Sequence, residues 1–166
     1  IYLLAYTPLK RRSSLCTLVG AAPGAIPPLM GWTASRGEID LNGLLLFLIL
    51  FSWQFPHFLA IAWIYREDYE RGGLRMLPSN DPEGWKTGWK IRLFSLGLLF
   101  LSIVPFFTGL TGLFYLGAAA LLGMVFVWSG FRMASAPNRV AARLLLRTSV
   151  IYLPLLLLSM TLTKTQ

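Results

Sequence analysis

Five long apolar blocks limit the folds open to this chain more than any other feature. They cover about residues 15–33, 41–64, 93–108, 113–131 and 144–162. Each block is long enough to form a helix that crosses roughly 30 Å of hydrocarbon at about 1.5 Å per residue. A chain of 166 residues cannot bury five helices that are apolar on all sides in a soluble core. The sequence therefore predicts that residues 1–166 form an all-α transmembrane bundle of about five helices in a lipid bilayer.

The distribution of charge supports this interpretation. Only 13% of the residues are charged, against about 25% in a typical soluble domain. Thirteen of the fifteen Lys and Arg residues lie in three alternate connections, residues 1–14, 65–92 and 132–147. Such alternation follows the positive-inside rule and predicts that these three segments face the cytoplasmic side. The net charge of +8 is thus explained by topology, and we expect no nucleic-acid partner.

The predicted loop of residues 65–92 is unusually rich in charge. It contains five of the seven acidic residues and six basic ones. One interpretation is a solvated loop held by salt bridges. Another is a site in which carboxylates bind a divalent metal and arginines bind phosphate. Mg²⁺ takes one or two carboxylates together with phosphate oxygens, and the planar guanidinium donates hydrogen bonds in pairs. Composition alone leaves both interpretations open.

The second apolar block contains two polar residues, Gln54 and His57. Polar residues inside a membrane usually face the bundle interior or a cavity. If the helix continues beyond Ile64, both residues lie within about 80° of Asp68 around its axis. One helix face would then lead from an apolar cavity with an imidazole to a charged rim. The alternative for His57 is a buried histidine that is hydrogen-bonded to a neighbouring helix.

Tyr6 and Lys10 lie four residues apart before the first block, so both can reach an anion at the interface. The alternative is an ordinary topology signal with a tyrosine at the membrane surface. No nucleotide-binding loop or zinc-protease motif is present, and Cys16 is the only cysteine. The chain begins with Ile1, within what reads as the end of a helix. We therefore expect that an N-terminal part precedes it.

Several segments together resemble the protohaem IX farnesyltransferases, a family of the UbiA prenyltransferase superfamily. They are residues 6–12 (YTPLKRR), 20–32 (GAAPGAIPPLMGW), 53–60 (WQFPHFLA), 62–69 (AWIYREDY) and 73–78 (GLRMLP). The last three apolar blocks agree with the family in pattern only. The resemblance implies nine helices around a central cavity that opens to the cytoplasmic side. Residues 1–166 would be the C-terminal part of this single transmembrane domain and supply about five of the helices.

The resemblance also implies a reaction, the transfer of a farnesyl group from farnesyl diphosphate to a vinyl group of haem B. The product would be haem O, used for haem A and cytochrome oxidase biogenesis. Mg²⁺ is the implied cofactor, and a homo-oligomer or a haem A synthase partner is left open. The membrane would be a bacterial plasma membrane or, alternatively, the mitochondrial inner membrane. Two other functions remain, a quinone or chlorophyll prenyltransferase of the same fold and a non-enzymatic transporter fragment.

Site residues follow from the matching motifs. The resemblance implies that Asp68 and Glu67 bind the metal and act in catalysis with Lys10 and Tyr6. The implied substrate-binding residues are His57, Gln54, Arg66, Arg71, Arg11 and Tyr65, with His57 on the haem side. Residues 64 and 72 are Ile and Gly, a departure from the superfamily's pair of aspartates four residues apart. Asp68 is therefore the main expected carboxylate. An Asn/Asp-rich motif is expected in the N-terminal half, so we expect this chain to be inactive alone.

Overall fold

The computed structural model describes residues 16–73 and 77–163. All regular elements in this part of the chain are helical. They are α2 (Cys16–Arg36), α3 (Leu41–Ile64), α4 (Arg66–Arg71), the 3₁₀ helix η2 (Leu77–Asn80), α5 (Trp85–Phe107), α6 (Leu113–Ser135) and α7 (Arg139–Leu162). The predicted all-α bundle is therefore confirmed.

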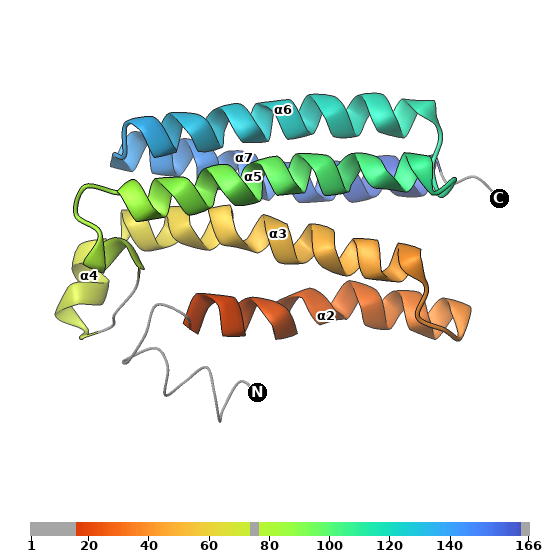
Figure 1. Ribbon diagram of the computed structural model, residues 1–166, viewed down its shortest axis with the longest axis horizontal. Coiled ribbons are helices and arrows are strands. Elements are labelled where there is room, and N and C mark those ends of the chain that lie inside the picture. Colours follow the sequence, from red (N-terminus) through yellow and green to blue (C-terminus); the bar gives the residue numbers. More distant parts are fainter. Residues whose placement is uncertain (1–15, 74–76, 164–166) are drawn as a thin grey trace.

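The five long helices lie side by side along one axis (Figure 1). α5 packs between α3 and α6, α7 packs against α3 and α6, and α2 packs against α3. At one end of the bundle lie α4, the start of α5 and the turn between α6 and α7. The α2–α3 and α5–α6 connections lie at the other end (Figure 1). The basic connections among the described residues thus gather at a single end.

Four helices of the described part, α3, α5, α6 and α7, are long and apolar enough to cross a membrane by length and composition. α2 has 21 residues and falls outside this group. It contains Pro23, Pro27 and Pro28, and prolines and glycines lower its mean hydropathy. A bilayer tolerates such a helix where neighbouring groups satisfy the freed carbonyls.

Two helices begin earlier than the apolar blocks predict, because polar side chains accept hydrogen bonds from N–H groups of their first turns. α5 begins at Trp85 rather than near residue 93, and Oδ2 of Asp81 accepts a hydrogen bond of 2.7 Å from the Thr87 N–H. α7 begins at Arg139 rather than near residue 144, and Oδ1 of Asn138 accepts one of 2.8 Å from the Ala141 N–H. Such side chains satisfy N–H groups that a helix start leaves unpaired. The predicted 65–92 loop accordingly contains α4, η2 and the first turns of α5.

Small residues bring the helices close together. A Cβ atom on Gly88 of α5 would lie 3.0 Å from the carbonyl oxygen of Ala134 on α6. Deep in the bundle, the Tyr152 hydroxyl lies 2.7 Å from Oγ of Ser102, and the Tyr115 hydroxyl donates to the Ser102 carbonyl at 2.8 Å. These contacts join α5, α6 and α7 into one unit, against which α3 is held.

Candidate substrate site along α3, α4 and α7

A charged cleft of about 250 Å³ opens where α3, α4 and α7 meet. α3 ends at Ile64 because Tyr65 leaves the helical backbone conformation, with φ −105° and ψ 20°. α4 then begins at Arg66 and places its first turn beside the start of α7. The cleft is lined by Ile64, Tyr65, Asp68, Arg139, Arg143 and Leu146. One carboxylate and two guanidinium groups therefore border the same space.

Two exposed ion pairs surround the cleft. Arg71 pairs with Asp68 within α4, and Nη2 of Arg139 lies 3.1 Å from Oε1 of Glu67. All four side chains are more than half exposed. No group of three His, Cys, Asp or Glu side chains in the described part is close enough to form a metal site. These residues could supply only a share of a metal's ligands, as in Mg²⁺ sites that phosphate oxygens complete.

Arg66 and Tyr65 have different surroundings. The Arg66 guanidinium lies over the Trp63 ring, 5.4 Å from its centroid, and Arg66 is not among the residues that line the cleft. Tyr65 is exposed and forms the hinge between α3 and α4. The positive-inside pattern of the sequence predicted Arg139 and Arg143 only as topology charges. Their spacing of four at the start of a helix, which puts both on one face, could have marked them as site residues.

His57 lies deeper in the bundle than the cleft, at the interface between α3 and α7, which we call the α3–α7 seam. Its Nδ1 is 2.8 Å from Oγ of Ser149 on α7. The indole N–H of Trp53 donates to the backbone carbonyl of Ser149 at 2.8 Å. The Trp53 and His57 rings are stacked, with centroids 4.6 Å apart. The seam thus passes from a charged rim to a polar group inside an otherwise apolar interface.

Gln54 faces a different neighbour. It is buried, and its Nε2 donates to the carbonyls of Ala21 on α2 and Leu50, both at 3.3 Å. The predicted continuous stripe from Gln54 through His57 to Asp68 is therefore not formed. Helix α3 stops at Ile64, and Gln54 faces α2 while His57 faces α7. The assignment of Gln54 to substrate binding stays a prediction.

Three of the predicted site residues, Tyr6, Lys10 and Arg11, lie outside the described residues. The expectation that they join Asp68 at the diphosphate site is therefore not tested by the geometry.

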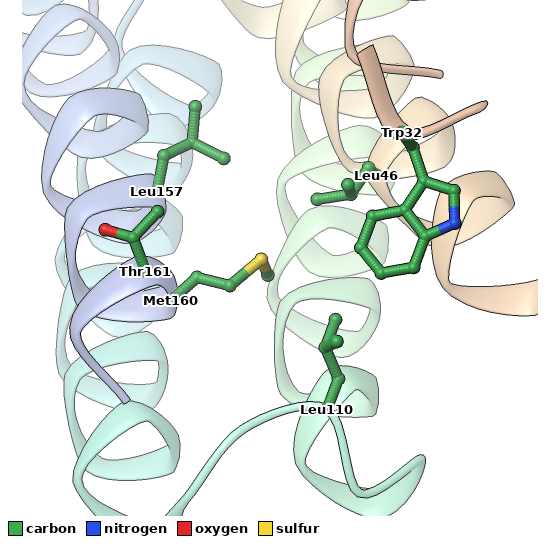
Figure 2. Close-up of a pocket in the computed structure, with 6 residues that line it drawn as sticks. All are labelled: Trp32, Leu46, Leu110, Leu157, Met160 and Thr161. Carbon is green, nitrogen blue, oxygen red and sulfur yellow. The ribbon is translucent and has the colours of Figure 1, made fainter. Parts of the chain in front are cut away.

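A second, apolar pocket of about 310 Å³ lies at the opposite end of the bundle. Figure 2 shows Met160 extending from α7 toward Leu46 and Trp32. The remaining lining residues are Leu110, Leu157 and Thr161. Eighteen residues of α3 separate Leu46 from Ile64, about 27 Å along the helix. The pocket is thus remote from the charged cleft and contains no ionisable group.

Comparison with known proteins gives consistent results. The sequence pattern of the UbiA prenyltransferase family matches residues 1–158. A protein named protoheme IX farnesyltransferase from Solibacter usitatus is 48% identical over 155 residues, which cover 93% of this chain and 53% of that protein. One of the same name from Koribacter versatilis is 45% identical over 172 residues, covering 99% and 56%. A third, from Anaeromyxobacter dehalogenans, is 51% identical over 123 residues, covering 74% and 41%.

The chain spans about half the length of the curated relatives that it matches. No solved structure matches it. Its apolar helices identify an integral membrane protein, and the relatives named above come from bacteria. A bacterial plasma membrane is therefore favoured over the mitochondrial inner membrane.

Proposed function

Because the chain belongs to the UbiA prenyltransferase family, we propose that it forms part of an enzyme that farnesylates haem. Such an enzyme transfers the farnesyl group of farnesyl diphosphate to a vinyl group of haem B and yields haem O. The names of the relatives favour haem over a quinone or chlorophyll acceptor. They also favour an enzyme over a transporter. Assembly as a homo-oligomer, or with a haem A synthase partner, stays a prediction.

The observation on which the proposal rests is the charged cleft, where Asp68 shares one space with Arg139 and Arg143. In the proposed reaction the allylic C–O bond breaks and the diphosphate leaves with the electron pair. Guanidinium groups stabilise the charge that develops on the departing oxygens. Their planar, two-pronged geometry suits phosphate. Tyr6, Lys10 and Arg11 would add further donors from the N-terminal side.

Asp68 is suited to hold Mg²⁺, because it is exposed at the cleft and its oxygens are not buried in a structural network. Each of the two carboxylates is paired with an arginine, but Glu67 does not line the cleft and is therefore the weaker candidate. Bound Mg²⁺ would neutralise diphosphate charge and so assist ionisation. With so few carboxylates, the remaining ligands must come from the diphosphate and from the half of the enzyme outside this chain.

The seam below the cleft suits the acceptor. Seven residues of α3 separate Ile64 from His57, about 10 Å along the helix. Trp53 and Phe58 flank the imidazole, and an apolar, aromatic wall protects a carbocation from bulk water. A vinyl carbon bonds to the farnesyl C1, and the cation left beside the porphyrin takes up water and loses a proton. Atoms and charge then balance as haem B, farnesyl diphosphate and water giving haem O and diphosphate.

The test is reconstitution in membranes with haem B, farnesyl diphosphate and Mg²⁺, followed by chromatography for haem O. The chain alone should give no haem O, because its relatives are about twice as long and half of the diphosphate site is expected in their N-terminal half. Co-expression with the N-terminal half of such a relative should restore synthesis. Turnover by the chain alone would disprove the divided site. Failure of a well-assembled pair to make haem O would argue against the function.

A further inference from the structure

The hydroxyl group of Ser149 makes two short contacts, and together they fix the tautomer of His57. Ser149 Oγ donates to the Leu146 carbonyl at 2.7 Å and lies 2.8 Å from Nδ1 of His57. A hydroxyl has a single proton. A carbonyl oxygen can only accept, so that proton points to Leu146, and Nδ1 must donate to Oγ. The proton of neutral His57 is therefore on Nδ1, and its Nε2 presents a lone pair.

The ring is also fixed in orientation. Trp53, one helical turn before His57, stacks on the imidazole and donates its indole proton to the carbonyl of the same Ser149. Ser149 is fully buried, so water does not compete for these contacts. One residue of α7 thus holds both aromatic side chains of α3 and limits rotation of the imidazole about its side-chain bonds.

The lone pair on Nε2 is not used within the described part of the chain. Nε2 makes no hydrogen bond with a described residue, and it is absent from the buried, unpartnered polar atoms of that part. It therefore remains accessible. A neutral imidazole can bind a metal ion through such an accessible ring nitrogen.

From this geometry we infer that His57 binds the haem iron through Nε2, with Ser149 and Trp53 as its positioning residues. This inference rests on the proposed function. A metal-bound histidine characteristically donates its other ring N–H to an oxygen, which sets the tautomer and the ring direction. The Nδ1–Oγ contact has that form. Iron bound by Nε2 would anchor the porphyrin, so the site would distinguish haem from a porphyrin without metal.

Binding measurements test this on an enzyme assembled from this chain and the N-terminal half of a relative. Haem B and metal-free protoporphyrin IX are titrated separately, and the absorption spectrum of the bound haem is recorded. His57→Ala should weaken haem B binding by about tenfold or more, remove the imidazole-bound spectrum and leave protoporphyrin IX binding unchanged. Added imidazole should restore the spectrum. Equal effects on both porphyrins, or no effect on either, would overturn the inference.

Ser149→Ala tests the positioning role, with Ser159→Ala as a matched control. Ser159 on the same helix also donates to a carbonyl three residues earlier, that of Leu156, at 2.7 Å. No histidine is hydrogen-bonded to it in the described part. Ser149→Ala should lower the affinity for haem B and shift the absorption spectrum of the bound haem. Ser149→Thr, which keeps the hydroxyl, should have the affinity and spectrum of the unmodified enzyme. Ser159→Ala should change neither the affinity nor the spectrum. Identical behaviour of the two alanine variants would refute the positioning role.

Synthesis of haem O by the same preparations separates the two proposals. If the unmodified enzyme makes haem O while His57→Ala leaves haem binding and its spectrum unchanged, the iron-ligand inference fails and the proposed function stands. If no haem O forms but the His57-dependent difference between haem B and protoporphyrin IX is present, the reaction is wrong and the iron ligand stands.

Discussion

Glu67 and Arg139 form an ion pair of 3.1 Å that joins the short helix α4 to the first turn of α7. Both side chains are more than half exposed, and exposed pairs typically contribute about 0–1 kcal/mol to stability. The pair therefore does little to hold the fold together. Its significance is geometric, because it marks the place where α4 lies beside the start of α7, and there Asp68 borders the cleft together with Arg139 and Arg143.

Asp68→Asn should abolish most farnesyl transfer in the assembled enzyme and leave the protein folded. The change removes a charged metal ligand from an exposed rim, where asparagine fits without strain. Haem O formation at saturating Mg²⁺ measures the loss, and Glu70→Gln on the same exposed helix is the control. Activity of Asp68→Asn within about threefold of the unmodified enzyme, under ~1 kcal/mol of barrier, would mean that Asp68 is only a surface charge.

Arg143→Lys should raise the KM for farnesyl diphosphate by about tenfold, because lysine keeps the charge but loses the paired donors, and hydrogen bonds to charged groups contribute about 1.5–3 kcal/mol. Arg132→Lys is the control, since Arg132 lies over Trp128, 5.7 Å from the ring centroid, and not in the cleft. Steady-state kinetics at varied farnesyl diphosphate concentrations measure the KM of each variant. Equal KM values for the two variants would remove Arg143 from the diphosphate site.

The sequence predicted the helical class and the second helix well, because apolar blocks and proline positions are local signals. It placed the starts of α5 and α7 too late, since polar first turns resemble a loop until the side chains that accept their N–H hydrogen bonds, Asp81 and Asn138, are recognised. Hydrophobicity marks the part of a helix that lies in lipid, and a helix can extend beyond it into the interface.

The site was only partly predictable. Motifs pointed to Asp68 and His57, but the break at Tyr65 depends on a backbone conformation that periodicity does not reveal. The partnership of His57 with Ser149 joins residues 92 positions apart in the chain. The local patterns of a single sequence carry no information about a contact between residues so far apart. Gln54 shows the same limit, because a polar residue in an apolar block does not indicate which neighbouring helix it faces.

Gly88→Val should destabilise the bundle by about 1–3 kcal/mol, the usual cost of overpacking. Its Cβ would lie 3.0 Å from the Ala134 carbonyl oxygen and 3.2 Å from the Ala134 Cα, so α5 and α6 would have to separate. Gly97→Val on the same helix is the control, because its Cβ would meet nothing within 4 Å. Denaturant unfolding in detergent measures both variants. Equal loss at the two positions would show that helix propensity, not close packing, is responsible.

Residues 83 and 136 should lie on the cytoplasmic face and residue 38 on the opposite face. The reason is that basic connections gather at one end of the bundle, with Glu83 and Ala136 at that end and Glu38 in the α2–α3 connection at the other (Figure 1). All three residues are exposed. Starting from Cys16→Ser, which removes the sole cysteine, the variants Glu83→Cys, Ala136→Cys and Glu38→Cys are treated in intact cells with a maleimide that cannot cross membranes. Only Glu38→Cys should be labelled before permeabilisation, and all three afterwards. Labelling of Glu83→Cys and Ala136→Cys from different sides would show that α5 and α6 do not both cross the membrane, and the charged cleft would then lack its cytoplasmic access.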